Sequence, residues 1–289
     1  MTVRAAIARV AQQEDINFLL TNRIPRRWLT IFVGWLSKIE NPLVAKPAIA
    51  LWRLFCDVDL RDARPTRYRS LHECFTRALK DGARPIAADP ATLVSPSDGI
   101  VGAFGKVVAG ECLQAKGFRY TLMDLLGDRE LVRQYQTGSY VTLRLTAGMY
   151  HRFHAPAACT VEKVTYISGD TWNVNPIAVQ RIENLFVKNE RAVIRLRLAD
   201  SGKVITLVPV AAILVASIRL HFANVLLHLR YKGPNEIPCK ADLARGEEMG
   251  WFQHGSTIIA FVPEGVQLAD GLETGATVRM GQPLFKVER

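Results

Sequence analysis

The feature that most constrains the fold is a series of short apolar segments, separated by Gly, Pro and Asp, that begins near residue 93 and continues toward the C-terminus. Short segments rich in Val, Ile and Leu between such turn residues are typical of β-strands. One helix is expected within this region, around 120–126. The expected strands are 93–94, 100–101, 107–108, 140–145, 160–167, 192–198, 204–218 and 257–262. The pattern predicts a β-rich, largely antiparallel core with few helices.

Residues 23–56 follow a different, helical period. A first helix should end at Asn41-Pro42, a second should run from about Pro47 to Phe55, and residues 71–78 should form a further short helix. The large apolar residues on one side of the first helix are Trp28, Ile31, Phe32, Trp35, Leu36 and Ile39. The basic residues around it are Arg23, Arg26, Arg27, Lys38 and Lys46. Such a face suits a helix that lies in a lipid interface, but it equally suits two helices packed on a core of their own.

Together these patterns predict an α+β protein in which N-terminal amphipathic helices precede the β-rich core. Residues 1–62 would form the helical segment and residues 63–289 the β-rich domain. The longest uncharged run, 204–218, has 15 residues and contains Pro209, so it is shorter than the roughly 18 residues of a membrane-spanning helix. An integral membrane protein is therefore not expected.

Composition narrows the function classes without choosing one. The net charge of +10 predicts a basic surface that could face either nucleic acid or anionic lipid. The five cysteines are widely spread and form no Cys-x-x-Cys pair, which indicates neither a disulfide framework nor a zinc site and favours a reducing, cytosolic-side environment. The sequence has no dinucleotide-binding glycine fingerprint and no Walker phosphate loop, so nucleotide chemistry has no support.

Three polar spots interrupt the apolar strands: Ser95–Gly99, Tyr150–His154 and Gly255–Thr257. The Gly-Ser-Thr triplet predicts a tight, sterically open bend in which Gly255 can bring its carbonyl close to the Ser256 hydroxyl. Taken alone, this triplet also fits an ordinary hairpin turn, and Asp98 fits an ordinary turn residue.

Histidine is the side chain best suited to accept a hydroxyl proton near neutral pH, and a carboxylate can fix its tautomer and offset the charge it gains. Asp98, His154 and Ser256 could therefore form an Asp-His-Ser set assembled from three distant turns. His151 and His154 could instead ligate zinc, but no third Cys, His or Glu stands at a usual spacing nearby. No metal site is predicted.

Taken together and in this order, the motifs resemble the phosphatidylserine decarboxylases, from about residue 60 to the C-terminus. The motifs that carry the resemblance are the three polar spots with Gly169-Asp170, Val174–Pro176, Asn184–Phe186, Lys188–Arg191 and Gly246–Gly250. Bacterial membrane-bound members of that family also begin with basic, Trp-containing helices, so the resemblance favours the membrane-interface interpretation of residues 23–56. Bacterial relatives often carry Leu where His254 stands here.

The resemblance implies a proenzyme that cuts itself between Gly255 and Ser256. His154, oriented by Asp98, would deprotonate Ser256, whose oxygen would attack the Gly255 carbonyl and turn the amide into an ester. β-Elimination would then cut the chain and leave a pyruvoyl group at the N-terminus of a small chain, 256–289, that stays bound to the large chain, 1–255. This covalent pyruvoyl group, derived from Ser256, would be the cofactor, and no separate one would be needed.

The same resemblance implies the reaction and its location. The pyruvoyl carbonyl would form a Schiff base with the amine of phosphatidylserine and accept the electrons released when CO2 departs. His151 is the candidate acid that protonates the resulting carbanion, and hydrolysis would free phosphatidylethanolamine. The enzyme would act in phospholipid biosynthesis as a peripheral protein on the cytoplasmic side of an anionic cell membrane, with no nucleic-acid partner. A homodimer is compatible with this interpretation.

Two other functions stay open at this point. A serine hydrolase could use the same Asp98, His154 and Ser256, but the Gly-x-Ser-x-Gly elbow is absent, since Thr257-Ile258-Ile259 follows the serine. A non-enzymatic basic module that binds lipid or nucleic acid fits the composition but leaves the ordered motifs unexplained. Only the self-processing interpretation predicts two chains from one gene product.

Overall fold

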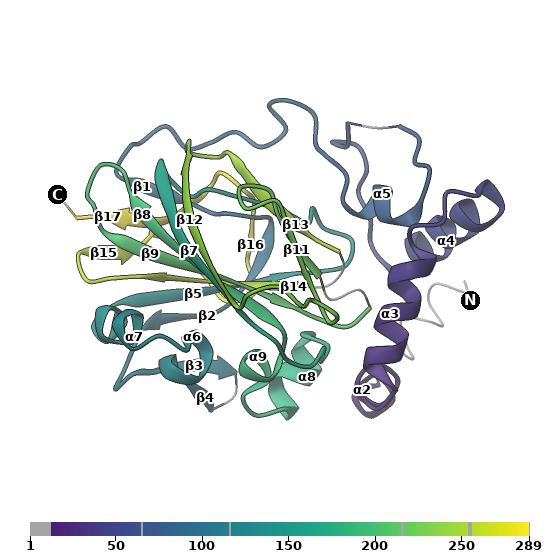
Figure 1. The fold of residues 1–289 in the computed structure, drawn as a ribbon, viewed down its shortest axis with the longest axis horizontal. Coiled ribbons are helices and arrows are strands. Elements are labelled where there is room, and N and C mark those ends of the chain that lie inside the picture. Colours follow the sequence, from purple (N-terminus) through teal and green to yellow (C-terminus); the bar gives the residue numbers. More distant parts are fainter. Residues whose placement is uncertain (1–12, 65, 116, 215–216, 254–255, 289) are drawn as a thin grey trace.

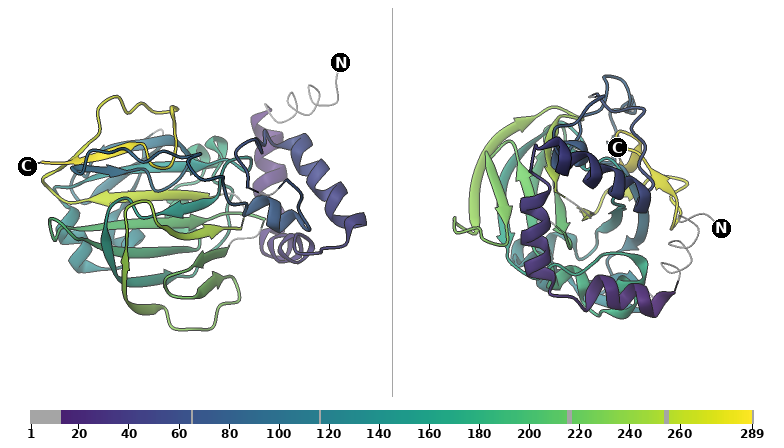
Figure 2. Two further views of the ribbon diagram at one scale, coloured as in Figure 1. Left: turned by 90° about the horizontal axis from the view of Figure 1, so that it is seen from above. Right: turned by 90° about the vertical axis from the view of Figure 1, so that its right-hand side faces the viewer.

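The structure, a computed structural model, describes residues 13–64, 66–115, 117–214, 217–253 and 256–288 of the 289-residue chain. Figure 1 shows a β-rich core with a group of N-terminal helices beside one end of it. The end-on view in Figure 2 shows these helices arranged around that end of the core. The arrangement confirms the predicted α+β class, with N-terminal helices followed by mostly antiparallel sheets.

Four helices precede the first strand in the described part of the chain. They are α2 (Glu14–Asn22), α3 (Arg26–Leu36), α4 (Pro42–Phe55) and α5 (Leu71–Phe75). The two helices predicted within residues 23–56 are confirmed, but α3 ends at Leu36 instead of at Asn41-Pro42, and α4 begins at Pro42 instead of Pro47. The Asn41 side chain caps it by accepting a hydrogen bond from the Leu43 N–H at 2.9 Å, and proline fits the first turn of a helix. Helix α5 begins as predicted and ends three residues earlier than expected.

An antiparallel sheet of eight strands forms the centre of the core. Its order is β12 (Glu236–Leu243), β7 (Cys159–Ile167), β8 (Arg191–Leu198), β9 (Val204–Ala211), β14 (Ser256–Val262), β5 (Ser139–Leu145), β2 (Gly99–Lys106) and β16 (Thr277–Val278). Strands β5, β7, β8 and β14 match the predicted segments within one residue at each end. Alternate residues of β14 point to opposite faces, and both faces are buried, which explains why its sequence is apolar throughout.

Each face of the central sheet has its own core. One face packs against a four-stranded sheet and a three-stranded sheet. The four-stranded sheet has the order β11 (Val225–His228), β10 (Ser217–Leu220), β13 (Glu248–Phe252) and β6 (Arg152–His154), and the three-stranded sheet has the order β1 (Thr92–Val94), β17 (Pro283–Val287) and β15 (Val266–Leu268). The other face, below the sheet in Figure 1, is covered by β3 (Glu111–Ala115), β4 (Phe118–Thr121), α6 (Leu122–Leu126), α7 (Arg129–Tyr135), α8 (Pro176–Arg181) and α9 (Leu185–Lys188).

Several predicted elements need correction. The apolar run 204–218 covers β9 and the start of β10, two strands in different sheets, and the sequence did not separate them because all five residues between them, 212–216, are apolar. Residues 107–108 form no strand, although Val108 makes an isolated bridge to Glu111. The helix expected at 120–126 begins at Leu122, and α7, α8 and α9 were not predicted. Helices of two turns or fewer give too short a periodic pattern to be separated from loops by sequence.

No helix in the described ranges is both long enough and apolar enough to cross a bilayer.

Candidate active site

Ser256 is the first residue of β14, and β13 ends four residues earlier at Phe252, so the strand boundary lies where the sequence predicts it. Gly255 and His254 lie outside the described residues. The expectation of a sterically open serine is wrong: Ser256 is 0% exposed. It lies opposite Ala211 of β9 and Leu145 of β5, with strands on both sides. Its buried Oγ has no hydrogen-bond partner among the described residues.

Asp98 directly precedes β2 and Ser256 begins β14, and these two strands run in the same direction because both are antiparallel to β5. Arg144 of β5 lies opposite both Ile100 of β2 and Thr257 of β14. Because neighbouring strands lie about 4.8 Å apart, the backbones of Ile100 and Thr257 are roughly 10 Å apart. The turn that contains Asp98 therefore lies at the same end of the sheet as Ser256.

The Asp98 carboxylate is buried and engaged by a guanidinium group. Arg84 donates from Nε to Oδ1 at 2.8 Å and from Nη2 to Oδ2 at 2.6 Å, and the Met280 N–H donates to Oδ1 at 2.9 Å. This fork-like pairing fixes the plane of the carboxylate. No hydrogen bond joins Asp98 to His154 in the described structure. The backbone N–H of His154, however, donates to the Pro96 carbonyl of the turn that contains Asp98, at 2.8 Å.

His154 is a buried histidine whose ring nitrogens both have partners. Its Nδ1 lies 3.0 Å from the Gly246 carbonyl, which can only accept, so Nδ1 carries the proton. Its Nε2 lies 2.9 Å from the Tyr150 hydroxyl and accepts from it. Burial lowers the pKa of His154 below the ordinary histidine value. The ring is therefore a neutral imidazole with an acceptor at Nε2, the form that a general base requires.

The backbone partner of His151 is nearer to Ser256 in the sequence than the backbone partner of His154 is. Its carbonyl accepts a hydrogen bond from the Phe252 N–H at 2.9 Å, whereas His154 lies opposite Glu248. The His151 ring is fully buried, its Nδ1 lies 2.9 Å from the Met149 carbonyl, and its centroid lies 4.0 Å from that of Phe75 in α5. A carbonyl can only accept, so Nδ1 is the donor in this hydrogen bond.

The motif Lys188–Arg191 contains two residues near the serine, Asn189 and Glu190, for which the sequence predicts no role. The Asn189 Nδ2 donates to the Ala211 carbonyl at 3.0 Å and to the Trp172 carbonyl at 2.9 Å, and it is fully buried. Since Ala211 lies opposite Ser256, Asn189 positions the strand next to the serine. The sequence feature that could have identified Asn189 is the polar pair Asn189-Glu190, which stands between a short apolar segment and a buried strand.

Glu190 is the second of these residues. Its carbonyl accepts from the Ala211 N–H at 2.8 Å, and the strand register places its side chain on the same sheet face as that of Ser256. Tyr166 donates its hydroxyl to Glu190 Oε1, and burial raises the pKa of Glu190 to about 7. A large share of this carboxyl group is therefore protonated near neutral pH, which limits buried negative charge on this face.

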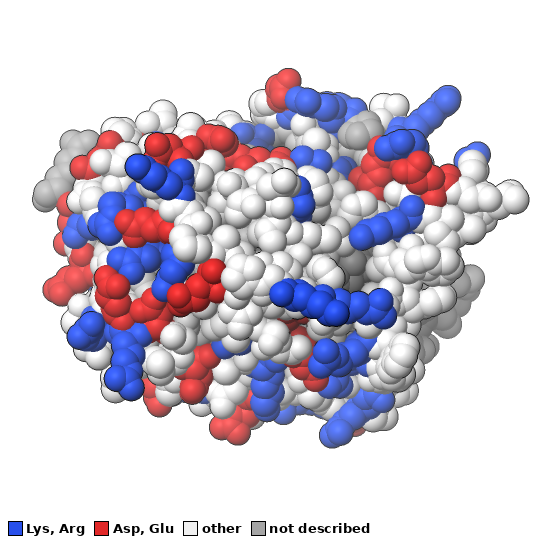
Figure 3. All heavy atoms as spheres, in the orientation of Figure 1, with Lys and Arg blue, Asp and Glu red and all other residues white. Residues whose placement is uncertain are grey.

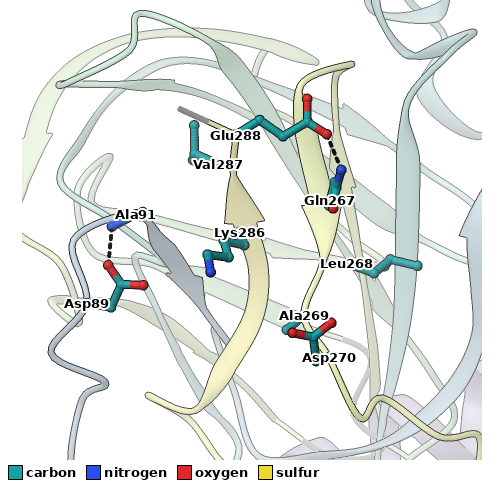
Figure 4. A pocket seen from close by; sticks show the side chains of 9 residues that line it. All are labelled: Asp89, Ala91, Gln267, Leu268, Ala269, Asp270, Lys286, Val287 and Glu288. Carbon is teal, nitrogen blue, oxygen red and sulfur yellow. Dashed lines mark hydrogen bonds between the residues drawn. The ribbon is translucent and has the colours of Figure 1, made fainter.

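A separate hollow lies at the other end of the molecule and contains none of these residues. Figure 4 shows it between β15, β17 and the segment before β1, with the carboxyl groups of Asp89, Asp270 and Glu288 around Lys286. The Asp89 carboxylate accepts from the Ala91 N–H at 3.0 Å, and Glu288 accepts from Gln267. Figure 1 shows β15 and β17, which border this hollow, beside the C-terminus and away from the N-terminal helices. It is therefore not the candidate active site.

Comparison with known proteins gives one consistent result. A family model described as phosphatidylserine decarboxylase matches residues 71–286. Three similar curated relatives are each named phosphatidylserine decarboxylase proenzyme. The protein of Haemophilus influenzae strain Rd is 36% identical over 90% of this chain and 92% of its own length. That of Pseudoalteromonas translucida is 34% identical over 92% of this chain and 95% of its own length. That of Escherichia coli O9:H4 is 35% identical over 90% of this chain and 84% of its own length.

Proposed function

This chain belongs to the phosphatidylserine decarboxylase family, and on that premise we propose that it is a proenzyme that cuts itself between Gly255 and Ser256 and then converts phosphatidylserine to phosphatidylethanolamine and CO2. Family membership decides against both the serine hydrolase and the non-enzymatic binding module. The observation that best supports the position of the cut is a fully buried serine, at the first position of a central strand, whose Oγ has no hydrogen-bond partner among the described residues. A buried hydroxyl without a partner costs stability, and this one directly follows the Gly255 carbonyl that it would attack.

In the first step Ser256 loses its proton and its Oγ attacks the Gly255 carbonyl carbon. We assign His154 as the base, because its neutral ring presents an acceptor at Nε2. Asp98 is the carboxylate that offsets the charge gained by the ring, and its negative charge raises the pKa of His154 against the larger, lowering effect of burial. Arg84 holds this carboxylate in place. The amide becomes an ester without any group from outside the chain.

The ester then undergoes β-elimination, in which loss of the Cα proton of residue 256 breaks the Cβ–O bond. Gly255 keeps both oxygens as a new C-terminal carboxylate, and residue 256 becomes a dehydroalanine that water converts to a pyruvoyl group with release of ammonia. The products are a large chain, 1–255, and a small chain, 256–289. The site of residue 256 fits this group, because its side-chain position is buried between the apolar Ala211 and Leu145 and a pyruvoyl group carries no charge.

The pyruvoyl group supplies a carbonyl that binds the substrate amine and accepts the electron pair left when CO2 departs. The chain's own residues must exclude water and deliver a proton to the carbon that loses CO2. We assign this proton delivery to His151, which is fully buried and hydrogen-bonded through its backbone to the segment that leads to Ser256. Burial keeps water away from the reacting carbon.

We further propose that residues 1–62 attach the β-rich domain, residues 63–289, to the cytoplasmic face of an anionic membrane. The exposed aromatic side chains of α3 support this proposal: Trp28 is 75% exposed, Phe32 54% and Trp35 62%. On α4, Leu43, Leu51 and Phe55 are also exposed. A helix pair packed on its own core would bury these residues, so their exposure favours a lipid interface.

Self-processing predicts two chains in the purified protein. Intact-mass measurement should find one species for residues 1–255 and one for residues 256–289 with pyruvate in place of serine, because elimination and hydrolysis remove the serine nitrogen and oxygen. Borohydride, which reduces a carbonyl, should change the mass of the small chain and leave that of the large chain unchanged. A purified protein that decarboxylates phosphatidylserine as one uncut chain would refute the proposed origin of the cofactor.

The membrane proposal predicts that replacing Trp28, Phe32 and Trp35 together by Ser weakens binding to anionic vesicles by at least about 100-fold. A large apolar side chain contributes about 1.5 to 3 kcal/mol when it is fully buried, so three of them exceed this loss. Self-cleavage should be unchanged, because these residues lie outside the β-rich domain. Vesicle sedimentation measures the binding, and a denaturing gel measures the cleavage.

The chain offers a control in three exposed apolar residues of the β-rich domain: Val108, Leu113 and Met123. Replacing these three by Ser also removes three exposed apolar side chains, but from outside α3, and should leave vesicle binding intact. Equal loss of binding in both triple variants would show that no particular face meets the membrane.

A further inference from the structure

A groove of about 380 Å³ separates α3 from the hairpin of β10 and β11. Its lining includes Ile31, Trp35 and Lys38 from the helical side and Ser217, Arg230 and Gln253 from the core side. Gln253 lies three residues before Ser256, a span of at most about 10 Å for an extended chain. The groove therefore connects the helices that we assign to the membrane with the segment that leads to the reacting residue.

The two cations of this groove have no acidic partner. None of the described residues that line it is Asp or Glu, and neither Lys38 nor Arg230 forms an ion pair with any described residue. Burial lowers the pKa of His228, which also lines the groove, and the charges of Lys38 and Arg230 lower it further. Figure 3 shows basic side chains over the border between the N-terminal helices and the core. The described lining of the groove therefore carries positive charge and contains no carboxylate.

Arg26 on the same helix provides a contrast. Its Nη2 pairs with Asp170 Oδ2 at 2.6 Å, and its guanidinium lies 3.5 Å from the centroid of the Trp172 ring. Arg26 therefore joins α3 to the core. Lys38 and Arg230, which make no such contact, are the cations that a ligand can pair with.

Ser217 gives an independent indication of a ligand. It is 4% exposed, it lines the groove, and its Oγ has no hydrogen-bond partner among the described residues. Its carbonyl accepts from the Gln253 N–H at 3.1 Å, which places it beside the segment that leads to Ser256. Because Ser217 lines the groove, its hydroxyl can donate to an acceptor on a ligand that binds there.

We propose that this groove binds the phosphodiester group of the lipid substrate, with Lys38 and Arg230 pairing with its negative charge and the Ser217 hydroxyl donating to one of its oxygens. This proposal rests on the proposed function. The apolar side chains of Ile31 and Trp35 would then line the path of the acyl chains toward the membrane.

The substrate carries two anionic groups, and only one of them suits these cations. The carboxylate leaves as uncharged CO2, so a cation paired with it would stabilise the ground state more than the transition state and slow the reaction. The phosphodiester keeps its single charge from substrate to product. Cations that pair with it therefore contribute binding energy at every stage without opposing decarboxylation.

The test compares the variant Lys38→Gln/Arg230→Gln with the control Lys46→Gln/Arg53→Gln, which removes two exposed cations of α4 outside the groove. The substrate is a short-chain phosphatidylserine used below its critical micelle concentration, so that vesicle binding plays no part. We expect the groove variant to raise KM by at least about tenfold, because each charge-assisted hydrogen bond contributes about 1.5 to 3 kcal/mol. Its kcat should stay within about twofold, and the control should leave both constants unchanged. Equal KM values for the two variants would overturn the proposal.

Chain cleavage separates this proposal from the function on which it rests. Both variants should be cut into two chains, which also reports that they fold. Wild-type protein that is uncut and inactive would refute the proposed function, whereas cut, active variants with unchanged KM refute only the groove assignment. Should the groove variant stay uncut, Ser217→Ala provides the second test, with an expected severalfold rise in KM and an unchanged kcat. An unchanged KM for that variant would likewise overturn the proposal.

An inhibition assay distinguishes a lipid phosphodiester from free phosphate. Short-chain phosphatidylglycerol, which has the phosphodiester but no serine, should inhibit the wild-type enzyme competitively and the groove variant at least about tenfold more weakly. Inorganic phosphate at the same concentration should not inhibit, because it cannot use the apolar walls. Equal inhibition by inorganic phosphate would show that the groove binds free phosphate instead of a lipid.

Discussion

Ser256→Ala should be recovered as a single, uncut chain of full length with no detectable decarboxylase activity. Without the hydroxyl, no ester can form at Gly255, and without the ester the chain is not cut and no pyruvoyl group arises. The variant should still fold, because alanine fits a fully buried position between two strands and removes a hydroxyl that has no described partner. Intact-mass measurement and a decarboxylation assay check both parts of this prediction.

The residue next to this serine provides a matched control. Thr257 also has a buried hydroxyl without a described hydrogen-bond partner, but its side chain points to the opposite face of β14. Thr257→Val removes that hydroxyl with little change of shape, and the protein should still be cut and active. Cleavage of Ser256→Ala at the same bond, or loss of cleavage in both variants, would contradict the assignment of the nucleophile.

The two histidines should separate cutting from turnover. His151→Ala should be cut into two chains yet lose about 10² to 10⁴-fold in kcat, the range typical of a lost proton donor. His154→Ala should stay uncut, because it lacks the neutral Nε2 acceptor that the first step needs. Asp98→Asn should be cut more slowly than wild type but faster than His154→Ala, since the asparagine removes the stabilising charge and leaves the base. A denaturing gel sampled over time and single-turnover kinetics of the cut fraction measure these effects.

The pH dependence of cutting tests the base independently. Burial lowers the pKa of His154, so the ring stays neutral to a lower pH than an ordinary histidine, and the rate of cutting should begin to fall only below the ordinary histidine range.

Two outcomes would contradict the roles assigned to the histidines. An uncut His151→Ala variant would show that His151 also takes part in cutting. A cut His154→Ala variant would remove His154 from the first step.

The sequence predicts those strands of the fold whose residue types and periodicity are typical of a β-strand from one end to the other. Strands β5, β7, β8 and β14 are such cases, because each is rich in Val, Ile, Leu or Tyr, either in a continuous run or alternating with polar residues. The run 204–218 misled, since both β9 and β10 are buried and the turn between them is as apolar as the strands. A chain that crosses from one sheet to another inside the core needs no polar marker.

The candidate site divides in the same way. The motifs identified Asp98, His151, His154 and Ser256, but their partners are set by tertiary packing. Arg84 is 14 residues from Asp98, and the Gly246 carbonyl that fixes the His154 tautomer is 92 residues away. The burial of Ser256 was missed for a related reason, since a turn-like triplet says nothing of the strands that lie on either side of it.

The position of β14 has a consequence for the two-chain protein that the proposed cut creates. Strand β14 lies between β9 and β5 from Ser256 to Phe261, all seven of its residues are buried, and β17 of the same small chain pairs with β1 of the large chain. The small chain therefore cannot dissociate while the large chain stays folded, because removing β14 would divide the eight-stranded sheet. Dilution should not dissociate the pair, and their lifetime together should equal the unfolding time of the whole domain. Once the mature enzyme is denatured, recovery would require a loose strand to insert between two others, so heat inactivation should be irreversible where that of the uncut proenzyme is not.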